Sequence, residues 1–137
     1  MVHALEIIHQ LLRPHGKLID IHPVGEPSPI EVRMGGQKIL AGWLTETDDF
    51  VEYKQADNAL AQAVQRGWFL VEREATFPFI THADSLNELR EYLAKEWKDA
   101  ILDDTTARKV EELMAGPERD KELLVHDRVH ILQLSDI

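Results

Sequence analysis

The feature that most constrains the fold is a hydrophobic period that switches between helical and strand spacing along the chain. Residues 3–13 place leucine and isoleucine at helical spacing, and Pro14 and Gly16 end that segment. Residues 17–22 then form a short apolar run rich in β-branched residues, which is typical of a strand. The chain therefore opens as an α/β protein, with a helix followed by a strand.

A proline-rich loop and a Gly-Gly pair organise the next part of the chain. Residues 23–29 contain three prolines and a glycine, which predicts a rigid loop. Two alternating segments, residues 30–34 and 38–44, flank Gly35-Gly36. This arrangement predicts a β-hairpin inserted at about residues 30–44.

The middle of the chain predicts one more helix and one more strand. Acidic and hydroxyl residues at 47–49 predict the N-cap of a helix over residues 50–65, and Gly67 ends that helix. Residues 68–79 alternate imperfectly between apolar and polar side chains, which predicts a strand. Pro78 marks an end or an edge of that strand, because proline cannot donate a ladder hydrogen bond.

Helix-capping residues organise the last third of the chain. Ser85 and Glu88 have the spacing of a capping box, and Asp103 or Asp104 predicts the N-cap of a further helix. The last predicted elements, two helices and a strand, are residues 85–98, 103–114 and 123–134. We therefore predict one α/β domain over residues 1–137, with a mixed sheet of about three main strands plus the hairpin, flanked by helices.

Composition excludes several classes of function. With 15 Lys and Arg against 25 Asp and Glu, the formal net charge is −10, so we expect no nucleic-acid partner and no docking on anionic membranes. The absence of cysteine excludes disulfide scaffolds, thiolate nucleophiles, zinc fingers and iron–sulfur clusters. No apolar run approaches the roughly 20 residues that span a bilayer, and the N-terminus lacks the basic start of a secretory signal. We therefore expect a cytoplasmic protein.

The turn after the first predicted helix carries a resemblance to a known family. Leu12-Arg13-Pro14-His15-Gly16 ends that helix and leads into a strand. This turn resembles the Leu-Arg-Pro-Gly-Gly turn before the fifth strand of class I S-adenosylmethionine-dependent methyltransferases, with His15 in place of the first glycine. The element order over about residues 3–135 is similar to the C-terminal half of the family. The resemblance implies a partial Rossmann-like methyltransferase fold, in which the last strand lies beside the fifth.

The chain departs from that family in the half that binds the cofactor. The family uses a Gly-rich loop after its first strand and an acidic residue at the end of its second. This sequence has neither, since Gly35-Gly36 opens no predicted helix. We therefore expect no cofactor in the isolated chain, and S-adenosylmethionine only where a partner completes the site. The first expectation is a methyltransferase-like assembly or binding module without autonomous methyl transfer.

The missing half also leaves a strand edge without its partner. In the family fold the segment Leu18–Ile21 would pair with a fourth strand, and an apolar edge strand invites pairing with another chain. Two arrangements are open. Either the hairpin at residues 30–44 folds over this edge, or two copies of the chain pair there as a two-fold homodimer.

Histidine is abundant, at 7 of 137 residues, and its spacing suggests a metal site. His126 and His130 are four residues apart in a predicted strand and therefore share a face, as do Asp20 and His22 at the end of the first strand. Because the resemblance places these two strands side by side, the four side chains could converge. Imidazole and carboxylate donors suit zinc, nickel or iron. The alternative is a solvated or hydrogen-bonded strand face.

Asp20 and His22 are also the candidate catalytic residues. They lie at the C-terminal end of a strand, where ligands bind in open α/β sheets, and His22 beside Asp20 resembles a base with its orienting carboxylate. If the hairpin folds back, Glu31, Arg33 and Trp43 would line the same mouth as candidate substrate-binding residues. The alternative for each of these residues is an ordinary turn or hairpin surface.

Three functions therefore stay open. The first is the methyltransferase-like module that acts by assembly. The second is a small-molecule or metal-binding enzyme that uses Asp20, His22 and the face of His126 and His130. The third is a fragment of a longer methyltransferase, which a neighbouring reading frame encoding a Gly-rich first half would favour.

Overall fold

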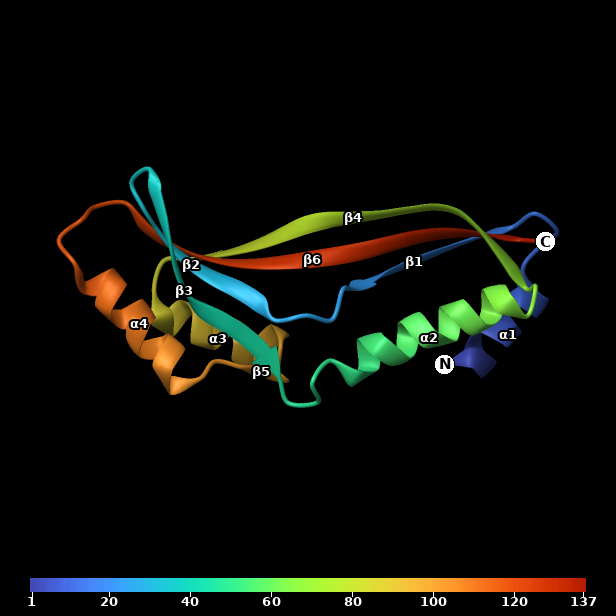
Figure 1. The fold of residues 1–137 in the computed structure, drawn as a ribbon, viewed down its shortest axis with the longest axis horizontal. Coiled ribbons are helices and arrows are strands. Elements are labelled where there is room, and N and C mark those ends of the chain that lie inside the picture. The colour runs from blue at the N-terminus through green and yellow to red at the C-terminus, as the bar shows by residue number, and fades with distance from the viewer. The chain divides into compact units, whose positions relative to one another are not determined.

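A computed structural model describes residues 1–137 and contains four helices and six strands (Figure 1). The chain forms two compact units, each built from segments that are distant in sequence. Unit 1 comprises Met1–Gly25, Phe50–Phe77 and Arg128–Ile137. Unit 2 comprises Glu26–Asp49 and Pro78–Asp127. Two long strands contribute residues to both units.

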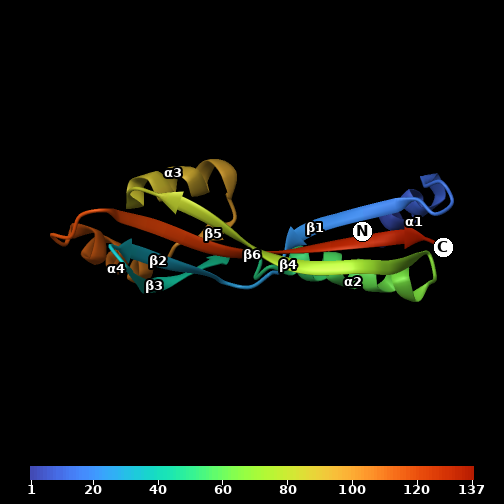
Figure 2. The same ribbon diagram turned by 90° about the horizontal axis from the view of Figure 1, so that it is seen from above.

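Unit 1 contains two helices on a three-stranded part of the sheet. The helices are α1 (Val2–Leu11) and α2 (Val51–Gln65), and the strands are β1 (Lys17–Pro23) with parts of β4 (Phe69–Ala83) and β6 (Lys121–Asp136). Strand β6, the last of the chain, pairs with both β1 and β4 and lies between them (Figure 2). Its pairing with β1 is antiparallel over the whole length of β1.

One face of the unit 1 sheet is covered by α1 and α2, and alternation along β1 decides which residues lie there. Leu18, Asp20 and His22 are partly or fully buried on the covered face, whereas Ile19 and Ile21 are exposed. This is the period of two that a strand imposes on its side chains. The covered face packs on the helices through a cluster of buried apolar side chains: Leu5, Ala59, Leu60, Ala63, Phe69, Leu132 and Leu134.

Unit 2 contains the hairpin and the other two helices. Its elements are β2 (Ser28–Met34), β3 (Gln37–Glu46), α3 (Leu86–Glu96), β5 (Ala100–Ile101) and α4 (Asp104–Ala115), together with the remaining parts of β4 and β6. Strand β2 pairs antiparallel with β3 and with β6, and β3 pairs antiparallel with β5. The predicted Gly-Gly hairpin is therefore confirmed, with strands longer than expected.

The two helices of unit 2 begin at the predicted N-caps. The Ser85 hydroxyl accepts a hydrogen bond from the backbone N–H of Glu88, and the Asp103 carboxylate accepts one from the N–H of Thr106. Helix α4 then approaches β3 closely, because a Cβ atom at Gly42 would overlap the Thr106 side chain. The caps fix where both helices begin, and the close approach at Gly42 fixes α4 against β3.

Several expectations about the sheet and its helices are wrong. The sheet is mostly antiparallel rather than mixed, because the long β6 runs antiparallel to both β1 and β2, and β3 runs antiparallel to both β2 and β5. The hairpin pairs through β2 with the unit 2 part of β6, whereas β1 pairs with the unit 1 part of β6. Residues 47–49 do not cap α2: its N-cap is Phe50, which is left-handed at φ 61° and makes no side-chain cap hydrogen bond. The partial Rossmann-like methyltransferase fold stays a prediction.

Two single residues explain local departures from the sequence patterns. Strand β4 continues through Pro78 to Ala83, which an edge strand tolerates because one side of it has no ladder to complete. His15 is left-handed at φ 63°, the conformation that glycine adopts most easily. None of the four helices combines the length and the apolar composition needed to cross a bilayer.

Candidate functional site

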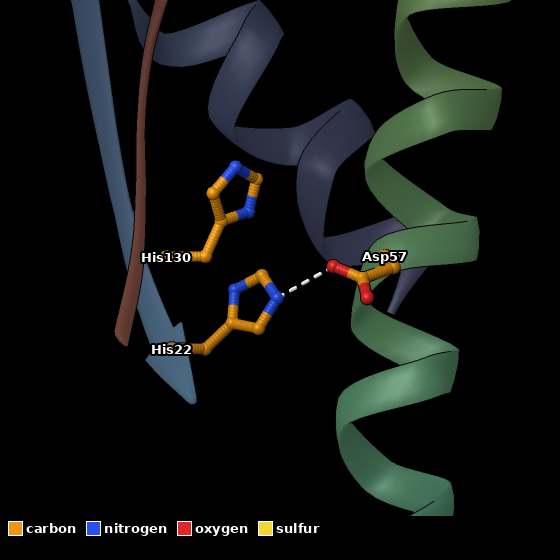
Figure 3. Close-up of side chains that lie close together, drawn as sticks. All are labelled: His22, Asp57 and His130. Carbon is orange, nitrogen blue, oxygen red and sulfur yellow. Dashed lines mark hydrogen bonds and ion pairs between the residues drawn. The ribbon is translucent and has the colours of Figure 1, made fainter. Parts of the chain in front are cut away.

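The candidate site lies in unit 1 and starts from a pair of histidines on adjacent strands. His22 on β1 and His130 on β6 are direct partners in the antiparallel register. Directly opposed residues share a face, so both rings lie on the face that the helices cover (Figure 3). Their ring centroids are 5.9 Å apart and the rings are nearly perpendicular, at 86°.

Helix α2 supplies a carboxylate to this histidine pair. Asp57 points from the helix toward the sheet, and its Oδ1 lies 2.6 Å from His22 Nε2 (Figure 3). The residue follows Ala56 and precedes Leu60 by three positions, so it lies at the margin of the buried stripe of α2. Its side chain is 51% exposed, whereas that of His22 is 9% exposed. The site is therefore open on the Asp57 side and closed behind His22.

Asp20 completes a chain of hydrogen bonds through the His22 ring. Its Oδ2 lies 2.5 Å from His22 Nδ1, on the opposite side of the ring from Asp57. Burial alone would lower the pKa of His22, but the hydrogen bonds to Asp57 and Asp20 outweigh it and raise the pKa. Contacts from both ring nitrogens to carboxylates are those of an imidazolium, which donates on both sides.

The arrangement can also hold a metal ion, provided that Nε2 of His22 gives up its proton and its contact with Asp57. One donor atom each from His22, Asp57 and His130 lies within 4.8 Å of the other two. Two imidazoles and one carboxylate form a donor set that suits zinc, iron or nickel. Asp20 would then hold the Nδ1–H of His22 and direct Nε2 toward the ion, as carboxylates behind metal-bound histidines do.

A groove of about 360 Å³ adjoins the site. Asp57 and His130 line it at one place, and the rest of its wall comes from α2, β4 and β6: Leu60, Ala61, Val64, Gln65, Val71 and Leu132. A further carboxylate, Glu74, lies 3.8 Å from Nε2 of His130 and is 66% exposed. The site thus combines metal-type donors with an adjacent, mostly apolar wall.

The structure brings together three of the four residues predicted to converge. Asp20, His22 and His130 lie in unit 1. There the first and last strands are neighbours, as predicted. His126 belongs to unit 2 and is not part of the group, since its Nε2 lies 3.3 Å from a Glu31 carboxylate oxygen. The His126/His130 pair predicted from spacing alone is therefore divided between the two units.

The hairpin residues predicted to bind substrate are also in unit 2. Glu31 pairs with His126, and Arg33 donates to the Glu122 carboxylate at 2.9 Å. Trp43, on β3, is 49% exposed. None of the three belongs to the group around His22.

Asp57 is the site residue that sequence reasoning missed. Residues 57, 60, 61 and 64 have the spacing of one helical stripe, and all four line the groove. The sequence did contain an indication of this role, because Asp57 places a carboxylate on the same helical stripe as Leu60 and Val64. It could not be assigned a partner without knowing which strand faces that stripe.

Comparison with models of known protein families, with curated proteins and with solved structures finds no match to this chain. The resemblance to class I methyltransferases therefore stays a prediction that rests on the sequence motif. A fold class alone does not determine function, so the chemistry of the site is the basis for assigning one.

Proposed function

We propose that unit 1 binds one divalent transition-metal ion through Nε2 of His22, the carboxylate of Asp57 and the imidazole of His130. The observation that carries this proposal is the convergence of the three donor atoms within 4.8 Å, from two strands and a helix. Three protein donors leave a fourth position for water or a ligand, which is typical of catalytic rather than structural zinc sites. The function is therefore metal-dependent binding or catalysis on a small molecule.

One shared ion requires small movements of the donor side chains, because His22 Nε2 and Asp57 Oδ1 are in direct hydrogen-bond contact at 2.6 Å. Donors about 2.0–2.1 Å from a tetrahedral zinc ion are about 3.3 Å apart. The side chains of Asp57 and His130 are 51% and 26% exposed, so both have free space into which they can rotate toward that separation. His22 is held more firmly, since it is buried and its Nδ1 contacts Asp20. The proposed centre therefore consists of one fixed ligand and two adjustable ones.

Equilibrium dialysis against zinc, followed by elemental analysis of the full chain, tests the proposal. We expect about one zinc per chain, and a loss of affinity of at least tenfold in both Asp57→Asn and His130→Ala. Asp20→Asn should weaken binding by about 10–100-fold, because it removes only the partner of a ligand. His126→Ala is the matched control: the same substitution on the same strand, outside the group. Zinc bound equally by all four variants, or by none including the parent, would refute the site.

A second candidate is supported by the strand order of unit 1. The last strand lies beside β1 and runs antiparallel to it, as the methyltransferase resemblance implies for its C-terminal half. The outer edge of β1 has no partner strand, and Ile19 and Ile21 are 50% and 58% exposed beside it. This favours a methyltransferase-like module that pairs as a homodimer through Leu18–Ile21.

Calorimetry with S-adenosylmethionine, on a sample whose mass is checked by light scattering, tests this second candidate. Binding tighter than about 100 μM, or about −5.5 kcal/mol, by a dimer would support a cofactor site completed by a partner. A monomer with rapid amide exchange at Ile19 and Ile21 would exclude pairing through this edge. The zinc measurements do not depend on either result.

A further inference from the structure

We propose that the groove beside the His22 site binds a small neutral molecule with one nitrogen or oxygen donor at one end and an aliphatic tail at the other. This inference rests on the proposed metal site and adds the class of ligand. The donor would occupy the open position on the ion, and the tail would lie along the wall formed by Leu60, Val64 and Leu132.

The wall of the groove argues for an aliphatic tail. Leu60 and Leu132 are 6% and 7% exposed, so their side chains form a fixed apolar base. Val71, on β4, is 36% exposed and forms part of the same wall. A volume of about 360 Å³ lies near the lower end of the range for small-molecule sites, roughly 300–1,000 Å³. The ligand is therefore small, and its apolar part is short.

The charges around the site argue for a neutral head group. No lysine or arginine lines the groove. A divalent ion would be balanced by the carboxylates of Asp57 and Asp20, both of which contact His22. Glu74, which lies beside His130, adds a further negative charge. Glu74 would repel an anionic head group, and no lysine or arginine of the groove offsets that repulsion, whereas a neutral head group is not repelled.

The polar end of the groove fixes the orientation of the ligand. Asp57 and His130 are both proposed metal ligands and both groove-lining residues, so the ion and the groove share a wall. A ligand whose donor atom binds the ion therefore places its tail against the apolar wall of the groove, alongside α2. The donor end of the ligand therefore lies beside Asp57 and His130, and the aliphatic end lies away from them.

Visible-absorption titration of the cobalt-loaded full chain with 1-methylimidazole, 1-hexylimidazole and hexanoate tests the inference. We expect 1-hexylimidazole to bind about tenfold to a hundredfold more tightly than 1-methylimidazole, because part of its tail is removed from water. Hexanoate should bind more weakly than 1-hexylimidazole. Equal affinity of the two imidazoles, or preference for hexanoate, would overturn the inference and leave the metal site standing.

A matched pair of tryptophan substitutions locates the tail. Ala61 is exposed on α2 and lines the groove, so Ala61→Trp should fill the groove and abolish the advantage of the hexyl tail. Gln62, the next residue, is exposed on the same helix and does not line the groove, so Gln62→Trp should retain that advantage. Metal content is measured on each preparation first. A parent protein that binds neither zinc nor cobalt would refute the metal site and the ligand together, whereas equal behaviour of the two variants would refute only the ligand position.

Discussion

The two units differ in what lies between their helices and their sheet. In unit 2 eleven buried apolar side chains form the cluster under α3 and α4, among them Ile30, Leu89 and Val110, which are 0% exposed. In unit 1 the corresponding cluster has seven members, two of which are alanines of α2. Unit 1 also accommodates the hydrogen-bonded His22 on its covered face. We infer that unit 2 supplies more of the stability and unit 1 the chemistry.

The helix termini show the same difference. Both helices of unit 2 have side-chain N-caps, from Ser85 and Asp103. The N-cap residues of the unit 1 helices are Met1 and Phe50, and neither makes a side-chain cap hydrogen bond. A helix without such a cap frays more easily at its first turn. Asp57 lies in the second turn of α2, close enough to that end to adjust when a ligand binds.

The largest expected effect separates the two cores. Leu89→Ala should lower the free energy of unfolding by about 2–5 kcal/mol, because it leaves a cavity in the larger cluster of unit 2. Leu5→Ala in α1 should fall at the lower end of that range, since Leu5 belongs to the smaller cluster and is 6% exposed. Urea denaturation monitored by circular dichroism measures both. A larger loss from Leu5→Ala would reverse the comparison.

Zinc binding should increase the protection of backbone amides from hydrogen exchange more in unit 1 than in unit 2. At a free concentration of 100 times the dissociation constant, a ligand that binds only the folded state adds about 2.7 kcal/mol. Hydrogen exchange should show the added protection first in α2, which carries Asp57, and less in α4. His130→Ala should lose this response. Equal protection of α2 and α4 in the parent would show that the two units respond as one.

Loss of a cap tests the helix-terminus comparison. Ser85→Ala should lower the free energy of unfolding by about 1 kcal/mol, because the N–H of Glu88 loses its acceptor. Ser85→Thr keeps a hydroxyl at the same position and should change stability by only a few tenths of a kcal/mol. Thermal denaturation of the three proteins measures the difference. No change in Ser85→Ala would remove capping as a distinction between the units.

The smallest expected effect depends on pH and concerns a carboxyl group of unit 2. Burial raises the pKa of Asp127, although a hydrogen bond from the Ser28 hydroxyl opposes the shift. A raised pKa in the folded state favours the protonated form. The protonated Asp127 therefore contributes to the free energy of unfolding at low pH, and this contribution is lost as the pH rises through the pKa of the folded state. Asp127→Asn should stabilise the protein by less than about 1 kcal/mol at pH 7 and leave it unchanged near pH 3.

Urea midpoints of Asp127→Asn and the parent at pH 7 and pH 3 measure this difference. Asparagine retains an oxygen that accepts from Ser28, so the substitution removes the charge and keeps the hydrogen bond. Ser28→Ala is the control for the hydrogen bond itself. A stabilisation that is the same at both pH values would show that ionisation of Asp127 has no part in it.

Local chemistry was sufficient to predict many of the elements. The hairpin at Gly35-Gly36 and the N-caps at Ser85 and Asp103 are present, because turns and caps depend on residues within a few positions of one another. The N-cap expected at residues 47–49 is wrong, since the chain turns through a left-handed Phe50 before α2 begins. Strand β5 was missed because its two residues carry no periodic signal.

The sequence by itself determined which residues could share a face. Asp20 with His22 follows from the period of two in a strand, and residues 57, 60, 61 and 64 follow from the helical period of α2. These relations need no knowledge of distant segments, because backbone geometry imposes them.

Only the tertiary structure decided which faces meet. The antiparallel register of β1 and β6 places His130, rather than His126, opposite His22, and packing of α2 on that face brings Asp57 to the pair. A one-residue slip in that register would turn the imidazole of His130 to the other face of the sheet. Pairing across more than 100 residues, from His22 to His130, depends on the burial of the whole unit 1 core, and no local pattern contains that information.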